Sequence, residues 1–297
     1  MHVVVTGSSG VLGAEASQVL AARRENRVIG YDRAEGGLVD VETRRLDLLE
    51  TSPDFRWPAE TEAVLHLAGT WSPVEPSAAS LALQLRTNVE LVARALAACG
   101  RGVRRFVYVS SMSVYGAASP VPFRETDPPR PDTFYGSTKW LGEQVCRVAA
   151  EARPDLALVI LRLAQVYGPG TPPRVVIYDF IDQALRTGQI WVECVPDLRR
   201  DHIYLSDAAE AMAAALTAAP PGTYNVGAGG HTMSDLVSAI RKASSHSVSV
   251  RFGGARGTAK VLDSTKFHGA TGFKARMSLH EGVRLEMARR KNELGLA

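Results

Sequence analysis

The sequence has few cysteines, little net charge and no long apolar run, and each of these absences narrows its class. Its 297 residues include three cysteines that lie far apart, so neither a disulfide framework nor a paired metal-binding motif is expected. The formal net charge is +3, from 34 basic and 31 acidic side chains, which is too balanced to predict nucleic-acid binding. No apolar run approaches the roughly 20 residues that span a bilayer, and we expect no signal peptide before the first strand. We therefore expect a cytoplasmic protein that binds no nucleic acid, membrane or metal.

The first thirteen residues carry the most informative pattern. The apolar run 2–5 leads into glycines 7, 10 and 13, with the spacing of a phosphate-binding turn between a strand and a helix. In such a turn Gly7 allows a sharp bend, Gly10 leaves room for a pyrophosphate, and Gly13 lets the helix approach the sheet. The N–H groups at the positive end of the helix would then bind the phosphates. A second apolar run ends at Asp32, nineteen residues beyond Gly13, where a carboxylate would hold an adenosine ribose.

Strand and helix signals alternate through the first half of the chain, which predicts an α/β fold with a doubly wound parallel sheet. The predicted strands are 2–5, 27–31, 44–48, 63–67, 105–109 and 156–163, and two predicted helices cover 77–99 and 133–152. Beyond residue 166 prolines interrupt the chain, and the elements become shorter. We therefore predict a Rossmann-type dinucleotide-binding domain at 1–165, with a returning segment at about 203–227. A smaller, irregular substrate-binding domain would comprise 166–202 and 228–297.

Tyr135 and Lys139 are four residues apart in the predicted helix 133–152, so they share one of its faces. An ammonium close to a phenol favours the phenolate, which would let Tyr135 act as a general base or acid near neutral pH. Ser111 follows the predicted strand 105–109, where its hydroxyl could orient a substrate hydroxyl or carbonyl. A Tyr-x-x-x-Lys pair also occurs on ordinary surface helices. Its position after the glycine turn and Ser111 favours the catalytic interpretation.

The order of these motifs resembles the extended short-chain dehydrogenases/reductases, and more narrowly the NAD-dependent epimerase/dehydratase family that acts on nucleotide sugars. The resemblance covers nearly the whole chain. The matching segments are 6–13, 66–69, 110–116, 135–139, 161–169, 200–204, 224–227 and 279–282.

The resemblance implies roles residue by residue. Ser111, Tyr135 and Lys139 would be catalytic, and Arg200 would pair with a substrate diphosphate, which suits a planar guanidinium. The implied cofactor-binding residues are Gly7, Ser9, Gly10, Val11, Leu12, Asp32, Arg33, Asp47, Leu48, Leu67, Ala68, Gly69, Asn88, Tyr135 and Lys139. The substrate-binding residues would be Trp71, Ser111, Ser113, Gln165, Arg200 and Arg256. Asp32 would repel a 2′-phosphate that Arg33 could accept, so NAD is the expected cofactor and NADP the alternative.

Departures from the family pattern refine the expected activity. Met112 and Ser113 stand where the dehydratases and decarboxylases of the family carry an acidic residue, so β-elimination is disfavoured. Gln165 replaces the usual asparagine, and 253–257 lacks a clear Arg-x-Gly-Asp match, which leaves the sugar and the nucleotide base open.

We expect an epimerase of a nucleotide sugar, acting at C4 through a transient keto intermediate. The alternatives are an NAD(P)-dependent reductase or dehydrogenase of a keto or hydroxy sugar and a non-catalytic dinucleotide-binding protein. The helices 77–99 and 133–152 resemble the family pair that forms a four-helix interface, so we also expect a homodimer.

Overall fold

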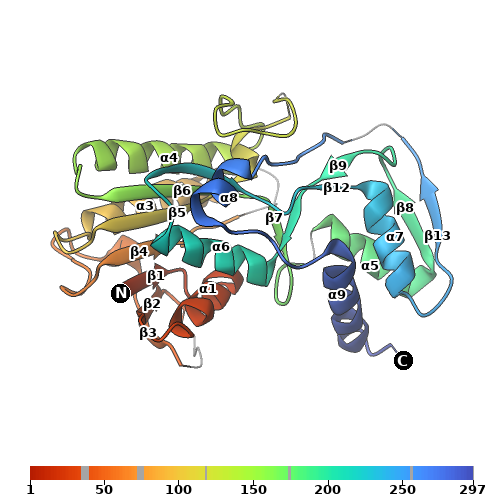
Figure 1. Cartoon of the computed structure of the whole chain (residues 1–297), viewed down its shortest axis with the longest axis horizontal. Coiled ribbons are helices and arrows are strands. Elements are labelled where there is room, and N and C mark those ends of the chain that lie inside the picture. Colours follow the sequence, from red (N-terminus) through yellow and green to blue (C-terminus); the bar gives the residue numbers. More distant parts are fainter. Residues whose placement is uncertain (35–39, 72–76, 118, 173–174, 255–256, 297) are drawn as a thin grey trace.

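The computed structural model describes residues 1–34, 40–71, 77–117, 119–172, 175–254 and 257–296. Its largest sheet has seven parallel strands (Figure 1). From one edge to the other these are β11 (Gly222–Val226), β6 (Ala157–Leu163), β5 (Arg105–Ser111), β4 (Ala63–His66), β1 (His2–Thr6), β2 (Arg27–Asp32) and β3 (Glu42–Arg45). This arrangement confirms the predicted α/β, Rossmann-type fold.

The strand order reverses at β1, which pairs with β2 on one side and with β4 on the other. Because the strands are parallel, their carboxyl ends share one edge of the sheet, and a crevice opens at the reversal point, where ligands bind in such sheets. Gly7 and Leu67 directly follow β1 and β4, while Asp32 and Ser111 end β2 and β5. Residues predicted to bind the cofactor and the substrate therefore meet at this edge.

Helices cover both faces of the sheet. They are α1 (Val11–Ala21) and α6 (Leu205–Thr217) on one face, and α2 (Ala78–Leu85), a π-helical turn (Arg86–Glu90), α3 (Leu91–Ala97) and α4 (Phe134–Glu151) on the other. The alternation of side chains along β1 explains this layering, because successive residues of a strand point to opposite faces. Val3 and Val5 pack with α1 and the alanine-rich α6, whereas Val4 packs with α3 and α4. The predicted helix 77–99 is thus observed with a π turn in its middle.

A smaller part of the chain has a core of its own and lies beside the carboxyl edge of the main sheet (Figure 1). Its helices are α5 (Val176–Thr187), α7 (Met233–Ala243) and α9 (Leu279–Glu293). Three strand pairs accompany them: β10 (His202–Tyr204) with β7 (Gln165–Tyr167), β12 (His231–Thr232) with β9 (Arg199–Arg200), and β13 (Ser249–Phe252) with β8 (Gln189–Val192). The remaining short helices are η1 (Leu48–Glu50), η3 (Met112–Val114) and α8 (Thr265–Thr271). The division into two domains stays a prediction.

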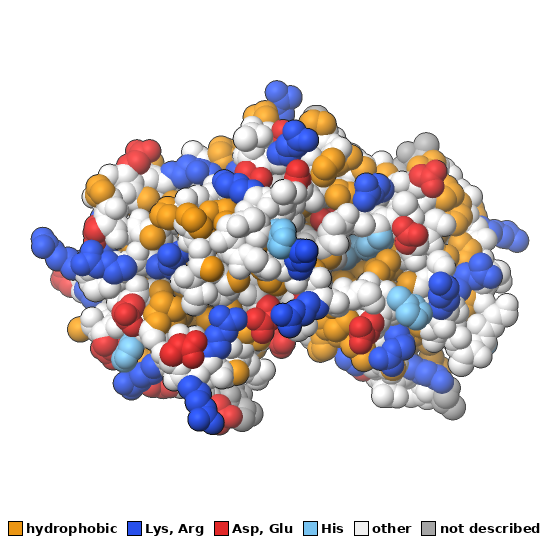
Figure 2. Space-filling model, viewed as in Figure 1, with side chains coloured by type: hydrophobic (Ala, Val, Ile, Leu, Met, Phe, Trp, Pro, Cys, Tyr) orange, Lys and Arg blue, Asp and Glu red, His pale blue; other side chains and the backbone are white. Residues whose placement is uncertain are grey.

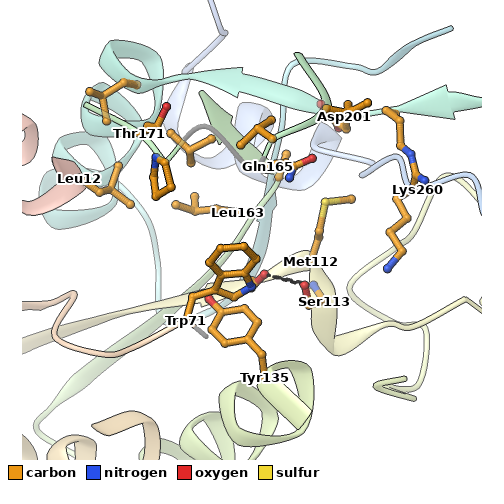
Figure 3. A pocket seen from close by; sticks show the side chains of 18 of the residues that line it. Leu12, Trp71, Met112, Ser113, Tyr135, Leu163, Gln165, Thr171, Asp201 and Lys260 are labelled. Atoms are coloured by element: carbon orange, nitrogen blue, oxygen red, sulfur yellow. Dashed lines mark hydrogen bonds between the residues drawn. The ribbon is translucent and has the colours of Figure 1, made fainter. Parts of the chain in front are cut away.

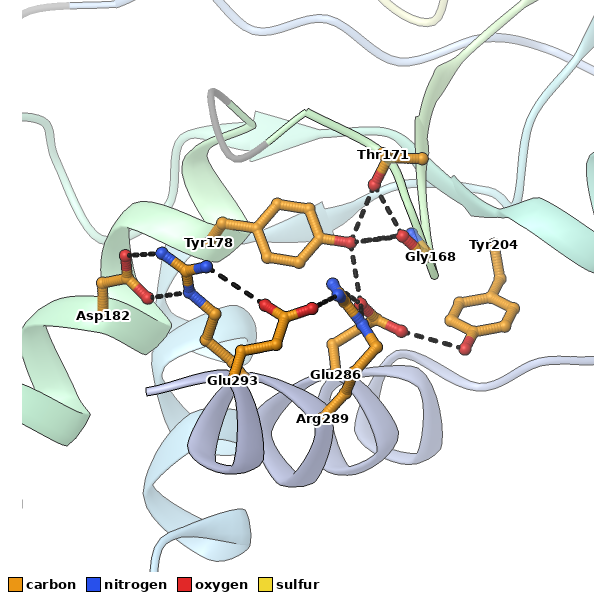
Figure 4. A network of polar contacts seen from close by, with 9 residues as sticks. Gly168, Thr171, Tyr178, Asp182, Tyr204, Glu286, Arg289 and Glu293 are labelled. Atoms are coloured by element: carbon orange, nitrogen blue, oxygen red, sulfur yellow. Dashed lines mark hydrogen bonds and ion pairs between the residues drawn. The ribbon is translucent and has the colours of Figure 1, made fainter. Parts of the chain in front are cut away.

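The buried carboxylate of Glu286 joins α9 to α5 and β10 (Figure 4). It accepts hydrogen bonds from the hydroxyls of Tyr178 at 2.8 Å and Tyr204 at 3.1 Å, and Arg289 pairs with it at 2.7 Å. The hydroxyl of Tyr178 also lies 2.8 Å from that of Thr171. Both oxygens of the carboxylate therefore have a partner, as a buried polar group requires. The network therefore fixes the loop that carries Thr171.

Basic and acidic side chains are interspersed on the face of the molecule seen in Figure 2. Within the described ranges, no helix is both long and apolar enough to cross a membrane. Nor do the described residues gather three or more His, Cys, Asp or Glu side chains in a group that could hold a metal ion.

Candidate active site

In the glycine turn between β1 and α1, the backbone lies so close to neighbouring backbone that Gly7 and Gly13 have no room for a side chain. Gly7 has a φ of +74°, and a Cβ there would lie 2.8 Å from the backbone nitrogen of Ala68. A Cβ on Gly13 would lie 2.0 Å from the carbonyl oxygen of Gly7, so no other residue fits without a shift of the backbone. Gly10 is the N-cap of α1, and no side chain caps this end of the helix. The N–H groups at the positive end of α1 are therefore available to an anion.

Asp32 is held beside this turn at the end of β2. Its carboxylate accepts hydrogen bonds from the backbone N–H groups of Ser9 at 3.1 Å and Ala34 at 3.0 Å. Arg33 follows and is exposed. Asp47 caps η1 through the N–H of Leu49 at 2.9 Å. These positions suit a bound adenosine ribose, because the carboxylate of Asp32 lies next to the turn that would hold the pyrophosphate.

Asn88 holds the segment after β4 in place. Its amide oxygen accepts from the N–H of Thr70 at 2.9 Å, and its amide nitrogen donates to the carbonyl of Thr70 at 2.8 Å and to the hydroxyl of Thr138 at 3.0 Å. A Cβ on Gly69 would lie 2.7 Å from the same amide oxygen. Asn88 lines the cavity described below, but its amide is used to join the β4 loop to α4. In this structure the side chain of Asn88 fixes the positions of Thr70 and Thr138.

Ser111 and Tyr135 face the same space at the end of β5 and the first turn of α4. The hydroxyl of Ser111 donates to that of Ser113 at 3.2 Å, as drawn in Figure 3, and accepts from the N–H of Ser113 at 3.2 Å. Burial raises the pKa of the Tyr135 phenol to about 12, although a hydrogen bond with Ser111 acts in the opposite direction. Tyr135 therefore keeps its proton at neutral pH.

Lys139 lies one turn further along α4 and is buried. Burial lowers the pKa of its ammonium to about 8, and its Nζ lies 4.4 Å from the ring centroid of Tyr108. The expectation that Lys139 would give Tyr135 a lowered pKa is wrong for this structure, because the burial of the phenol outweighs any stabilisation of its phenolate.

Beneath these residues lies a buried polar network that the sequence did not predict. Glu143, one turn beyond Lys139 on α4, forms a two-point ion pair with Arg162 of β6, at 2.9 and 2.7 Å. It also accepts from the hydroxyl of Ser110 at 2.7 Å, and Arg162 donates to the hydroxyl of Tyr115 at 2.9 Å. The network joins β6 to β5 and α4, and the last two of these elements carry the predicted catalytic residues.

A cavity of about 950 Å³ brings most of the predicted site together (Figure 3). The predicted residues that line it are Gly7, Gly10, Val11, Leu12, Leu67, Gly69, Trp71, Asn88, Ser111, Ser113, Tyr135, Lys139, Gln165 and Arg200. Those that do not are Ser9, Asp32, Arg33, Asp47, Leu48 and Ala68, which belong to the adenosine side of the glycine turn. Arg256 lies outside the described residues.

Several cavity residues had no sequence signal. They are Thr171, Asp179, Gln183, Trp191, Glu193 and Lys260, which come from the smaller part of the chain and the loops that lead to and from it. Asp179 and Gln183 lie on the regular helix α5 and the others on short strands or loops, and no recognised motif includes any of them. Lys260 points into the cavity on the side of Ser113 and Met112 in Figure 3.

Arg200 brings an available positive charge into the cavity. It is half-buried, and burial lowers the pKa of its guanidinium. No carboxylate of the described residues forms an ion pair with it. A half-buried guanidinium without such a partner suits an anionic group of a ligand, such as a diphosphate.

The fold and the cavity are those of a dinucleotide-dependent enzyme. The model of the NAD dependent epimerase/dehydratase family matches residues 3–227, and the chain belongs to this family. Among curated relatives, the uncharacterized UDP-glucose epimerase YtcB of Bacillus subtilis is 27% identical over 238 residues, covering 73% of this chain and 72% of that protein.

Solved structures agree with this assignment. MoeE5 in complex with UDP-glucose and NAD superposes with a TM-score of 0.82 at 29% identity, covering 98% of this chain and 100% of that one. The NAD complex of UDP-glucose 4-epimerase from Thermus thermophilus gives a TM-score of 0.76 at 28% identity, covering 97% and 98%.

Proposed function

We propose that this enzyme inverts C4 of a nucleotide-linked hexose or its acid, using NAD without consuming it. The observation that carries the proposal is the single cavity that holds Ser111, Tyr135, Lys139 and Arg200 together with the glycine turn. The names of the similar proteins support it, since they include UDP-glucose 4-epimerase and MoeE5 bound to UDP-glucuronic acid and NAD.

The residues around the glycine turn fit NAD. The uncapped N-terminus of α1 would bind its pyrophosphate, Asp32 the adenosine ribose and Lys139 the nicotinamide ribose. When bound, NAD supplies an acceptor and donor of hydride. The carboxylate of Asp32 disfavours the 2′-phosphate of NADP.

Tyr135 transfers the proton in this mechanism. Its phenolate would take the proton of the C4 hydroxyl when C4 is oxidised to the ketone, and the resulting phenol would give that proton back to the C4 oxygen when the turned keto sugar is reduced again at C4. Because the pKa of Tyr135 is raised to about 12, this phenolate is a strong base but only a small population at neutral pH. Ser111, hydrogen-bonded to Ser113, orients the reacting oxygen. Arg200 binds the diphosphate and so holds the nucleotide in place while the sugar turns.

The cavity lacks a carboxylate where dehydration would need one. Met112 and Ser113 follow β5, and the acidic residues that line the described cavity are Asp179, Glu193 and Asp201, all from the smaller part of the chain or the segment that joins it. The carboxylate oxygens of Asp201 accept hydrogen bonds from the N–H groups of Ala228 and Leu262, at 2.9 and 3.1 Å. Epimerisation needs only the Ser/Tyr/Lys set, which is present.

Incubation with UDP- and GDP-sugars and a catalytic amount of NAD tests the proposal. We expect an isomer of unchanged mass, detected by mass spectrometry and chromatography. Loss of one water would show a dehydratase. Consumption of stoichiometric NADH or NADPH, or reduction of NAD in step with turnover, would show the alternative reductase or dehydrogenase.

We further propose that the enzyme is a homodimer built on α2 and α4. Leu83 and Leu85 of α2 are each 42% exposed, and Leu141 and Val148 of α4 are 44% and 67% exposed. Leu141 and Val148 are seven residues apart and share a helix face, so they give α4 an apolar stripe that a second copy could cover. A cytoplasmic location is also proposed, supported by three buried cysteines that carry free thiols.

A further inference from the structure

A tight turn at residues 168–171 follows β7 and lies against the first residue of α1. The N–H of Thr171 donates to the carbonyl of Gly168 at 3.1 Å, and its hydroxyl donates to the same carbonyl at 2.7 Å. A Cβ on Gly170 would lie 3.4 Å from Cγ2 of Val11. Val11 and Thr171 both line the cavity, and Thr171 lies on the same side of it as Leu12 in Figure 3. The turn therefore faces the N-terminus of α1, the end that suits a pyrophosphate.

The turn is fixed by the phenol of Tyr178, which comes from α5 (Figure 4). The phenol oxygen accepts from the N–H of Gly168 at 3.0 Å and lies 2.8 Å from the hydroxyl of Thr171. On the other side, a Cβ on Gly168 would lie 2.6 Å from Cβ of Leu205, the first residue of α6. The turn is thus held between α6 and a single hydroxyl group of α5.

Glu286 of α9 determines where the proton of Tyr178 points. Burial raises the pKa of Tyr178, so its hydroxyl stays protonated at neutral pH. This one proton has two acceptors within reach, the carbonyl of Gly168 at 2.7 Å and the carboxylate of Glu286 at 2.8 Å. The carboxylate is the stronger acceptor. The phenol oxygen therefore donates to Glu286 and keeps its lone pairs for the N–H of Gly168.

From these contacts we propose that Glu286, acting through Tyr178, is a positioning residue that holds the turn 168–171 over the pyrophosphate end of the NAD site and slows the release of NAD. Release requires the wall opposite α1 to move, and this movement breaks the hydrogen bonds between Tyr178 and the turn. The lifetime of a complex depends on such contacts more than its rate of formation does. The inference goes beyond the proposed function, because it needs NAD to bind but does not depend on which reaction follows.

The rate of NAD release tests the inference directly. The full chain is loaded with isotope-labelled NAD and chased with unlabelled NAD, and the label that stays bound is followed over time. Tyr178→Phe removes the hydroxyl that contacts the turn, and we expect the label to be lost about 10-fold faster. The matched control is Tyr204→Phe, which removes the other hydroxyl bonded to Glu286, at 3.1 Å, and should release NAD as the wild type does.

Urea unfolding without NAD separates positioning from general stability. Tyr178→Phe and Tyr204→Phe each take one hydroxyl from the same carboxylate, so we expect similar losses of stability. A difference in NAD release then reports on the turn alone. Equal acceleration of release by the two variants, or release from Tyr178→Phe at the wild-type rate, would overturn the inference.

Thr171→Val is the second variant, because it removes a hydroxyl within the turn and leaves α9 untouched. It should also release NAD faster, and a wild-type rate in this variant would equally contradict the role of the turn. Glu286→Gln weakens the acceptor of Tyr178 and should change the rate in the same direction. If the wild type retains NAD as expected but converts no nucleotide sugar, the proposed function fails and the inference stands.

Discussion

Glu143 and Arg162 form a two-point ion pair in the interior, with side chains that are 0% and 2% exposed. The pair connects α4, which carries Tyr135 and Lys139, to β6, the second strand from one edge of the sheet. Ser110, next to the predicted catalytic Ser111, donates to the same carboxylate. Together with the hydrogen bond of Ser110, the ion pair therefore holds α4 against β5 and β6, and the Ser/Tyr/Lys set is built from α4 and β5.

Removing one partner of this pair should destabilise the fold strongly. In Glu143→Gln the charge of Arg162 stays buried without its counterion, and we expect the free energy of unfolding to fall by about 3–5 kcal/mol. Urea unfolding measures the change. The matched control is Glu42→Gln, which removes an exposed ion pair with Arg44 and should cost much less. Equal losses in the two variants would contradict the structural role assigned to Glu143.

Tyr135→Phe should abolish turnover without affecting cofactor affinity. The hydroxyl serves proton transfer, and general acid–base catalysis contributes roughly 10²- to 10⁴-fold to the rate. Steady-state kinetics and an NAD titration separate the two effects. Tyr224→Phe is the control, because its hydroxyl bonds the carbonyl of Pro220 outside the cavity. A Tyr135→Phe enzyme with more than about a tenth of the wild-type kcat would exclude the proposed role.

Asp32→Ala should weaken NAD more than NADP. The carboxylate would accept the ribose hydroxyls of NAD and repel the 2′-phosphate of NADP, so its loss removes both effects. Both cofactors are titrated into wild type and variant. Arg33→Ala serves as the companion variant and should reduce only the residual NADP affinity. A wild type that already prefers NADP would show that Arg33 governs the choice and would reverse our assignment.

Binding of NAD should weaken between pH 7 and pH 9. Lys139 has a pKa lowered to about 8 by burial, so its ammonium is charged below that pH and neutral above it. A charged donor to the ribose is lost on this rise, and we expect affinity to fall by about 10-fold. Lys139→Ala should bind weakly and without this pH dependence, whereas Asp32→Ala should bind weakly and keep it. Identical pH profiles of the wild type and Lys139→Ala would refute the role of the ammonium.

Local patterns made the fold and the glycine turn predictable. The spacing of Gly7, Gly10 and Gly13 is a local signal, and the alternation of short apolar runs with helices predicts a parallel sheet that is covered on both faces. The contact of the Trp191 ring with Gly253 joins residues far apart in the chain, and β8 is only four residues long, too short to reveal its period.

The degree to which each side chain is buried could not be predicted from the sequence. The positions of Tyr135 and Lys139 were read from their spacing, but the pKa of each depends on how much water the folded chain excludes. The partnership of Glu143 with Arg162 likewise appears only when α4 is packed on β6. Asn88 was assigned to the cofactor by resemblance, whereas its hydrogen bonds to Thr70 and Thr138 depend on the packed loop.

The last prediction concerns the interface of the proposed dimer. A negative charge at Val148, in the apolar stripe of α4, should prevent a second copy from packing there, since a carboxylate would be buried without a partner. Light scattering at micromolar concentration should give a dimer for the wild type and a monomer for Val148→Glu. Leu285→Glu on α9, where the side chain is also exposed, should remain dimeric. A wild type that is monomeric, or a Val148→Glu variant that stays dimeric, would remove α4 from the interface.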